Sequence, residues 1–470
     1  MRVLLINPAM NLEKLGRFAA LLEPMPPTGL AYIAGSLEAH GVEVRCVDMF
    51  ADGLSAQDVV DRAVRFEPEL VGMTVLTPSA PVCEELTARI KRALPGVKVV
   101  WGGVHADVFA EEICRDVGVD FAVHYDGEIT ACEIVDALSA GETDLSAIDG
   151  LSWRTTGGEV VTNKPRSLNR DLDSLPYPAW HLLPYHRYGL LPFADIAKPV
   201  LTMAASRGCP YRCDYCSLIH TGGKTYRRRD PVRIVDEYEH LVDRYGVKQI
   251  GFVDPIFPLV KKDLRPFCEE MERRGLDQRC VWLSETRADR LDAETCELMY
   301  RGGCRRVLLG IESGVDMLLG NVNKTLTTDK VRSGVASARA AGIQTVGLFM
   351  IGLPGETPEL TLETIEFAVD LDLDFAKFAI TVPFPGSKLF EDRWQKSLHR
   401  DDWENYTTFN PDPDRLIYHP HNYDPAELIR MQSYALRRFY MRPKQIRKQL
   451  FELRTLTPKV LFNGLYGIAV

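Results

Sequence analysis

Three cysteines in one short segment are the residues best suited to chemistry in this chain. Cys209, Cys213 and Cys216 follow the apolar run at residues 200–205 with the spacing C-x3-C-x2-C. Zinc sites and ordinary four-thiolate iron–sulfur sites need a fourth ligand, and the next cysteine, Cys268, stands alone much further along. Three thiolates can hold three irons of a 4Fe–4S cluster and leave the fourth iron open to a chelating small molecule. The alternative is a structural zinc or redox knuckle.

The same segment, C-P-Y-R-C-D-Y-C from Cys209 to Cys216, resembles the signature of radical S-adenosylmethionine enzymes. Tyr215, directly before the last cysteine, is part of that resemblance. The resemblance implies that the amino acid end of S-adenosylmethionine occupies the open iron. An electron from the cluster then cleaves the sulfonium to a 5′-deoxyadenosyl radical, which implies an external one-electron reductase of the flavodoxin or ferredoxin type.

The segment opens a stretch in which six apolar runs alternate with helical patterns. We expect strands at residues 200–205, 249–254, 281–286, 306–311, 344–351 and 375–382. Asp230-Pro231 and Thr357-Pro358 each provide a helix cap with a first-turn proline, and Gly246 ends the first of these helices. This pattern predicts a partial (β/α)6 barrel of the TIM type, with its chemistry at the carboxyl ends of the strands.

Polar residues follow several of these strands. Asp254 could neutralise the methionyl ammonium, and Arg287 could grip the carboxylate by two parallel hydrogen bonds. Glu312 or Ser313 could bind ribose hydroxyls, and by the family resemblance residues 351–357 lie against adenine. Each of these alone is explained equally well as a structural ion pair or turn, whereas their order along one barrel favours a cofactor site. The expected contacts of S-adenosylmethionine are Tyr215, Asp254, Arg287, Glu312, Ser313, Gly352 and Leu353.

The first part of the chain has its own alternation of strands and helices. Apolar runs at residues 3–7, 42–48, 70–76, 97–102 and 121–124 are separated by helical patterns at 29–39, 56–66, 80–94, 106–116 and 130–139. This order predicts an α/β fold with a doubly wound, Rossmann-like parallel sheet that binds its ligand at the carboxyl ends of the strands. No G-x-G-x-x-G follows the first strand, which makes a dinucleotide site a poor prediction.

This layout resembles the cobalamin-binding domain that precedes the radical domain in one large subfamily. The segments P-P-T-G-L at 26–30, G-G-V-H at 102–105 and G-E at 127–128 carry the resemblance. No D-x-H-x-x-G occurs, so a histidine-ligated cobalamin of the mutase type is not supported, and His105 and His124 are better explained as polar residues at strand ends. The expected cobalamin contacts are Thr74, Leu76, Thr77, Gly102, Gly103, His105, Gly127 and Glu128.

The two resemblances together imply a cobalamin-dependent radical enzyme. The favoured reaction is methylation of an unactivated carbon, or of phosphinate phosphorus, in a small or lipid-like metabolite, by way of the 5′-deoxyadenosyl radical and methylcobalamin. The same domain pair also serves cyclisation or rearrangement without methyl transfer. A non-enzymatic iron–sulfur electron-transfer protein is the remaining alternative.

Composition limits the setting of this activity. A net charge of −9 argues against nucleic acid as a partner. No apolar stretch approaches the ~20 residues that span a bilayer, and the apolar run at the N-terminus is too short for a signal peptide. Eleven cysteines, mostly single, suit a reducing cytoplasm.

We expect four parts along the chain. A cobalamin-binding domain covers residues 1–147, a hairpin with a linker covers 148–198, the barrel covers 199–390 and a mainly helical region covers 391–470. In the last part, a basic stretch at 424–460 is best explained as a helix that packs on the barrel, and a weak contact with an anionic membrane surface is the alternative. The aromatic residues of this part, which either close the substrate cavity or simply pack, are Trp394, Trp403, Tyr406 and Phe409.

Overall fold

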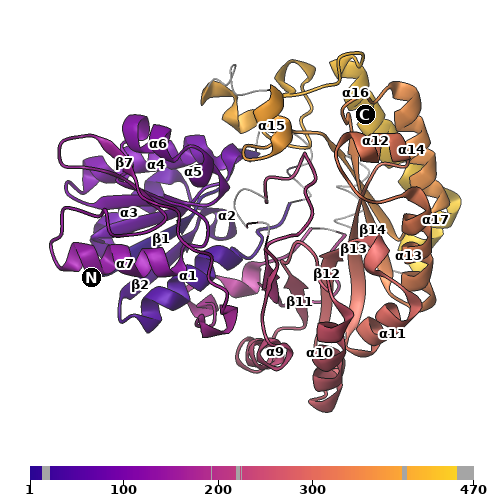
Figure 1. The fold of residues 1–470 in the computed structure, drawn as a ribbon, viewed down its shortest axis with the longest axis horizontal. Helices are drawn as coiled ribbons and strands as arrows, with labels where there is room; N and C mark the ends of the chain where they lie inside the picture. Colours follow the sequence, from indigo (N-terminus) through magenta and orange to yellow (C-terminus); the bar gives the residue numbers. More distant parts are fainter. Residues whose placement is uncertain are drawn as a thin grey trace.

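Two sheets organise the chain in the computed structural model, which describes residues 1–12, 19, 22–191, 193–218, 223, 225–393 and 400–452. The first sheet has the strand order β2-β1-β3-β4-β5-β6-β7, and the second has the order β15-β14-β13-β12-β11-β8. Figure 1 shows the first sheet with its helices, in indigo and violet, beside the second, in magenta to orange. The predicted fold class, a parallel α/β sheet followed by a partial barrel, is confirmed.

The five predicted strands of the first sheet are all present and parallel. They are β1 (Arg2–Asn7), β2 (Glu43–Asp48), β3 (Leu70–Thr74), β4 (Lys98–Gly102) and β5 (Phe121–Val123). Helices α1 (Thr28–Ala39), α2 (Met49–Asp52), α3 (Ala56–Phe66), α4 (Ala80–Ala93) and α7 (Glu128–Ser139) connect or follow them. The helix expected at 106–116 is instead broken into α5 (Val104–Val108), α6 (Ala110–Glu112) and a π-helical turn (Ile113–Val117), because Phe109 leaves helical torsion angles.

The predicted hairpin belongs to this sheet. Strands β6 (Leu151–Arg154) and β7 (Val160–Thr162) pair with each other in antiparallel fashion, and β6 pairs in the same way with β5. The hairpin therefore extends the first sheet at its β5 edge.

All six strands of the predicted barrel are present, and each pairs with its neighbours in parallel. They are β8 (Val200–Met203), β11 (Gln249–Phe252), β12 (Val281–Thr286), β13 (Cys304–Glu312), β14 (Gln344–Ile351) and β15 (Phe375–Ile380). Helices α9 (Pro231–Tyr245), α10 (Lys261–Arg273), α11 (Ala293–Arg301), α12 (Asp316–Asn321), α13 (Thr328–Ala340) and α14 (Pro358–Asp370) lie between them. The predicted caps are confirmed: Asp230 accepts hydrogen bonds from Val232 N and Arg233 N, Thr357 accepts one from Leu360 N, and Gly246 ends α9 with φ +66°.

The lower end of the barrel, where the strands begin, is closed by apolar side chains. Inward residues of the strands, Leu283, Leu308, Val346 and Phe375 among them, pack with Leu190 from the linker. Arg306 is buried beside this floor, and burial lowers its pKa to about 10. Its guanidinium donates hydrogen bonds to the carbonyls of Phe193 and Asp195 and to the side chain of Gln344. These contacts hold the linker across the end of the barrel where the strands begin. A reaction site is therefore expected at the opposite end, where the strands finish.

The described part of the C-terminal region combines helices with a stretch of loop and 3₁₀ turns at residues 400–424. It contains α15 (Lys388–Arg393), α16 (Pro425–Tyr440) and α17 (Pro443–Arg447). Gln432 of α16 donates hydrogen bonds to the carbonyls of Phe378 and Thr408, so this basic helix packs on the barrel as expected. No helix in the described part of the chain has both the length and the apolar character needed to cross a membrane. Trp394 lies outside the described residues.

The first prediction concerns the floor of the barrel. Replacing Arg306 by Met should lower the free energy of unfolding by about 2–3 kcal/mol, because several buried acceptors lose their donor. Arg305→Met is the matched control, since the Arg305 side chain is partly exposed and stacks on Tyr300 at the surface; it should cost under about 1 kcal/mol. Denaturant unfolding of the two variants checks this, and equal losses would contradict the role given to Arg306.

Candidate active site

A cavity of about 380 Å³ lies where the carboxyl ends of the two sheets meet. On the side of the first sheet it is lined by the ends of β3, β4 and β5, and on the barrel side by residues that follow β8 and β11. Of the eight expected cobalamin contacts, five line this cavity: Thr74, Gly102, Gly103, Gly127 and Glu128. Leu76, Thr77 and His105 do not.

The cavity continues from the strand ends down one face of the first sheet, beneath α1 and α7. Leu5, Gly72 and Val100 of three neighbouring strands line its floor, and Ile33 and Ile134 line its roof. Such a slot, apolar and without side chains at Gly72 and Gly102, suits a flat group inserted edge-on against the sheet. The residues present therefore fit a large ligand with a long tail that ends in a planar base, as cobalamin has.

The two adjacent glycines after β4 differ in what they do. Gly103 has φ +99°, and a Cβ atom there would lie 2.9 Å from the carbonyl oxygen of Val75. Gly102 has no heavy atom within 4 Å of the place of a Cβ atom. Gly103 is therefore required by the turn itself, whereas Gly102 keeps the cavity open.

His105 points away from the cavity into the protein core. It is fully buried, with its ring 4.7 Å from that of Phe109 and 4.3 Å from that of Trp403. Its Nδ1 atom lies 3.4 Å from the hydroxyl of Thr77. His124 is also held within the first sheet, because its two ring nitrogens bond to Asp107 and Ser152.

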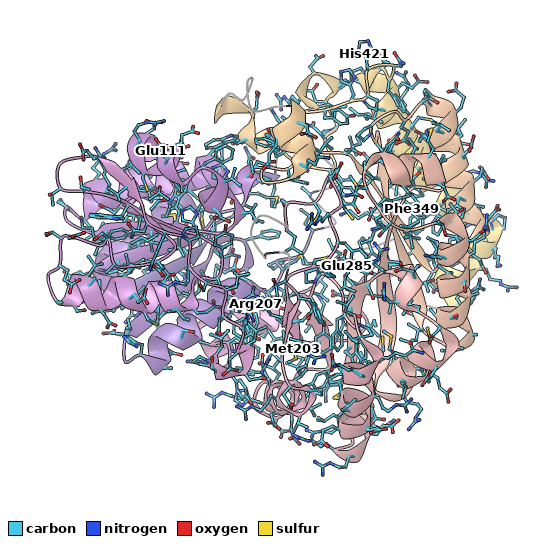
Figure 2. All side chains as sticks on the ribbon, in the orientation of Figure 1. Glu111, Met203, Arg207, Glu285, Phe349 and His421 are labelled. Carbon is cyan, nitrogen blue, oxygen red and sulfur yellow. The ribbon has the colours of Figure 1, made fainter. Side chains whose placement is uncertain are left out.

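Ion pairs that the sequence did not predict join the two sheets beside the cavity. Arg207, two residues before the first cysteine of the motif, contacts Glu128 at 2.5 Å and Asp126 at 3.1 Å. Arg227 pairs directly opposite Arg207 on a two-stranded ribbon of β9 (Ser206–Arg207) and β10 (Arg227–Arg228), and it contacts the same Asp126. Burial lowers the pKa of Arg207, but Glu128 and Asp126 outweigh it and hold that pKa above its ordinary value. Figure 2 marks Arg207 where the two halves meet.

The three cysteines of the motif lie on one loop next to the barrel. Cys213 is buried, and Cys209 and Cys216 are half-buried. Cys213 and Cys216 line a second cavity of about 800 Å³. Burial raises the pKa of Cys209 and raises that of Cys216 to about 11. Hydrogen bonds of the Asp214 backbone to Val322 and Leu389 fasten the loop to its surroundings.

Three thiols on one turn fit the donor set of a 4Fe–4S cluster with one open iron. Within the described residues, no three His, Cys, Asp or Glu side chains converge as the ligands of a single metal ion would. A cubane does not require such convergence, because each thiolate binds a different iron.

Glu312 connects the cysteine loop to the barrel. Its Oε1 atom accepts hydrogen bonds from the Tyr215 hydroxyl at 2.8 Å and from Lys324 Nζ at 2.7 Å. Tyr215 also packs against an apolar cluster that contains Leu353, at the end of β14. The structure thus brings three of the expected S-adenosylmethionine contacts together and adds Lys324, which the sequence analysis missed.

Other expected contacts of S-adenosylmethionine serve the fold in this structure. The Ser313 hydroxyl, which is buried, lies 3.0 Å from that of Thr364. Gly352 has φ +83°, and the backbone N–H of the adjacent Leu353 donates a hydrogen bond of 2.7 Å to buried Glu356. These residues shape the ends of β13 and β14.

Arg287 and Asp254 hold the segments that flank the cysteines. The Arg287 guanidinium forms two hydrogen bonds to Asp289, at 3.0 and 2.9 Å, and lies 3.8 Å above the ring of Tyr211, inside the motif. The Asp254 carboxylate accepts hydrogen bonds from Ala205 N at 2.9 Å and from the Ser206 hydroxyl. Burial raises the pKa of Asp254 to about 7.

Two further titratable residues face the inside of the barrel above its apolar floor. Glu285 lies on the same face of β12 as Leu283, and Lys377 lies on the same face of β15 as Phe375. Glu285 is open to the interior space yet surrounded by the barrel wall, and burial together with the charge of Glu312 raises its pKa to about 7. Burial lowers the pKa of Lys377. Strand alternation, with a charge among inward apolar residues, is the signal that could have found both; Figure 2 labels Glu285.

This fold and site define a class, the radical S-adenosylmethionine enzymes that carry an N-terminal cobalamin-binding domain. Residues 16–135 match the family described as B12 binding domain, and residues 203–368 match the Radical SAM superfamily. An uncharacterized methyltransferase of Pyrococcus horikoshii is 33% identical over 94% of both chains. The anaerobic magnesium-protoporphyrin IX monomethyl ester cyclase of Rubrivivax gelatinosus is 30% identical over 94% of this chain and 78% of that protein. The chain belongs to this family, and its cofactors are a 4Fe–4S cluster, S-adenosylmethionine and cobalamin.

A solved structure agrees with this assignment at the level of the fold. The radical S-adenosylmethionine methyltransferase TsrM of Kitasatospora setae, with cobalamin and a [4Fe-4S] cluster bound, has a TM-score of 0.68 to this chain. The match covers 83% of this chain and 76% of the TsrM chain, at 23% sequence identity. Membership of the family, not the shared fold, identifies the chain as an enzyme, so the alternative of a non-enzymatic electron-transfer protein was wrong.

The second prediction separates the two glycines. Gly102→Leu should fill the cavity and lower cobalamin retention at least tenfold, while the unfolding temperature of the cofactor-free protein stays the same. Gly103→Ala should lower that temperature, because its Cβ meets the backbone in a left-handed conformation. Cobalamin content after anaerobic reconstitution and thermal unfolding check this. A Gly102→Leu variant that retains cobalamin would place the ligand elsewhere.

The third prediction concerns pH. The pKa of Asp254 is about 7 in the folded protein against an ordinary value of 3.8, so the folded state binds this proton more tightly than the unfolded state. Stability is therefore lost as pH rises from about 4 to 7, and Asp254→Asn removes that loss. The free energy of unfolding of the variant minus that of the wild type should grow by roughly 1–3 kcal/mol between pH 5 and 7. A difference that does not change with pH would contradict the shift.

Proposed function

We propose that this enzyme transfers a methyl group to an unactivated carbon, or to a phosphinate phosphorus, of a small or lipid-like metabolite. The observation that supports the proposal most is the cavity shared by both sheets at their carboxyl ends, beside the cysteine loop. A methyl donor held there stands at the mouth of the barrel in which a radical is made. The fold shared with a methyltransferase structure is consistent with this reaction.

Each cofactor has its own proposed set of residues. Cys209, Cys213 and Cys216 hold the cluster. Cobalamin, when bound, supplies the methyl group, and S-adenosylmethionine on the reduced cluster supplies the radical that removes hydrogen from the substrate. The proposed contacts of S-adenosylmethionine are Tyr215, Asp254, Arg287, Glu312, Ser313, Gly352 and Leu353. Those of cobalamin are the five expected residues that line the cavity, Thr74, Gly102, Gly103, Gly127 and Glu128; Leu76, Thr77 and His105, which do not line it, are left out.

Glu312 is well placed to accept a hydrogen bond from a ribose hydroxyl when S-adenosylmethionine binds. Its Oε1 atom is held by Tyr215 and Lys324, which fixes the orientation of the carboxylate for a ribose hydroxyl. Inside the barrel, Glu285 and Lys377 have no ion pair or hydrogen bond with a described residue, and they are the polar groups that we assign to the substrate.

Cyclisation or rearrangement without methyl transfer is the second candidate. It is favoured by the likeness to the magnesium-protoporphyrin ester cyclase, which covers 94% of this chain. For either reaction we propose an external one-electron reductase, a cytoplasmic setting and no nucleic acid partner. A weak membrane contact of the basic C-terminal helix stays a prediction.

The mass of the product decides between the two candidates. Protein reconstituted anaerobically with iron, sulfide and cobalamin is incubated with S-adenosylmethionine, a reductant and cell extract. Methylation adds one methylene unit to the substrate, whereas cyclisation removes hydrogen or adds oxygen without a carbon. Deuterated methyl groups on S-adenosylmethionine show whether the new carbon comes from it.

The fourth prediction concerns the cluster. Cys213→Ala should abolish the visible absorbance of the cluster and the formation of 5′-deoxyadenosine, because two thiolates do not hold a cubane securely. Cys268→Ala is the control, since Cys268 is a buried apolar residue of α10; it should keep its iron. Absorbance and iron content are measured. A full cluster in Cys213→Ala would refute the assignment.

A further inference from the structure

Tyr125 stands at the junction of the two large cavities. It lines the cavity of about 380 Å³ that we assign to cobalamin and also the cavity of about 800 Å³ at the cysteines. No other residue of the described chain lines both. Tyr125 therefore lies at the boundary between the cavity that we assign to cobalamin and the cavity beside Cys213 and Cys216.

The backbone of Tyr125 is strained. Its φ of +58° is left-handed, a conformation that glycine adopts freely and that a bulky residue adopts only at a cost in free energy. Such strain persists where the surrounding structure enforces it, and it is concentrated at functional sites. A tyrosine kept there at a cost points to a use for the ring.

The residues on both sides of Tyr125 are held in place by hydrogen bonds and ion pairs. His124 bonds to Asp107 at 2.6 Å and to Ser152 at 2.8 Å, within the first sheet. Asp126 pairs with Arg207 and Arg227 of the barrel. The turn between them is held from both halves of the molecule, so the direction of the Tyr125 side chain is fixed by the contact between those halves.

We propose that the ring of Tyr125 is a wall between the cavity assigned to cobalamin and the cavity of the cluster cysteines, which keeps the 5′-deoxyadenosyl group off cobalamin. The inference rests on the proposed cofactor sites. Without a wall, the unpaired electron at C5′ and that of cob(II)alamin would combine to a cobalt–carbon bond. One electron from the reduced cluster splits S-adenosylmethionine into methionine and the 5′-deoxyadenosyl radical. Combination of this radical with cob(II)alamin would then give adenosylcobalamin without a leaving group.

Tyr125→Gly removes the ring and the strain together. In the absence of substrate, with S-adenosylmethionine, dithionite as the electron donor and glycerol as the hydrogen-atom donor, the wild type should release 5′-deoxyadenosine. In the variant the 5′-deoxyadenosyl radical should combine with cob(II)alamin instead, and adenosylcobalamin should form at least tenfold above the wild-type level, detected by chromatography and by its loss in light. Tyr125→Phe, which keeps the ring, should stay at the wild-type level of adenosylcobalamin.

Thermal unfolding of the cofactor-free protein is the second readout. Tyr125→Gly should unfold no earlier than the wild type and later than Tyr125→Ala, which keeps the strain without the ring. Glu67→Gly is the matched control, because Glu67 has φ +48° on the exposed end of α3; it should relieve strain without forming adenosylcobalamin.

Two results would overturn the proposal. One is a Tyr125→Gly variant that holds cobalamin and cluster yet forms no more adenosylcobalamin than the wild type. The other is a variant that no longer retains cobalamin, since the ring would then be a binding contact. Failure of the proposed function is distinguishable, because it appears already in the wild type as missing cobalamin or missing cleavage of S-adenosylmethionine.

Discussion

The pairing of Arg207 and Arg227 with Asp126 and Glu128 is the interaction on which the relation between the two cofactor sites depends. The arginines lie opposite each other on a short ribbon that leads into the cysteine loop, and the carboxylates follow the last parallel strand of the first sheet. Like charges placed opposite each other repel, and removing one partner of a buried ion pair costs about 3–5 kcal/mol. The arginines therefore find these two acids only with the first sheet in place, which fixes the position of the cysteines relative to the cavity that we assign to cobalamin.

A second layer of polar contacts lies beneath this ion-pair cluster. The hydroxyls of Thr28 and Thr202 are 2.6 Å apart, and the Tyr32 hydroxyl donates to Glu237 of α9 at 2.9 Å. Burial raises the pKa of Glu237, which Arg229 opposes by pairing with the same carboxylate. Hydrogen bonds of this kind are directional, so they set the angle between the sheets more narrowly than apolar packing alone would.

The sequence predicted the elements well because their signals are local. Strand runs, proline after a cap at Asp230 and Thr357, and the spacing of three cysteines all lie within a few residues. The direction of a side chain just after a strand is harder to predict from the sequence, because it depends on the conformation of the turn that follows. After β3, a 3₁₀ turn (Thr77–Ser79) takes Thr77 into the core beside His105, while Thr74 still faces the cavity. The ion-pair partners of Arg207, Asp126 and Glu128, lie far away in the sequence, and no local pattern predicts them.

The barrel interior changes character from its floor to its mouth, and this gradient limits the substrate. The floor is apolar and closed by the linker, the next layer carries Glu285 and Lys377, and the mouth carries Glu312, Lys324 and the cysteine loop. Burying a charge without an ion pair or hydrogen bond is costly, and this cost contributes to the raised pKa of Glu285 and the lowered pKa of Lys377. Lys377 also lies 5.3 Å from the ring of Phe409. A polar group of the substrate that reaches this layer would pair with these side chains and so remove the cost of burying them. Binding energy gained there, away from the reacting carbon, would hold that carbon at the mouth, between the radical and the methyl donor.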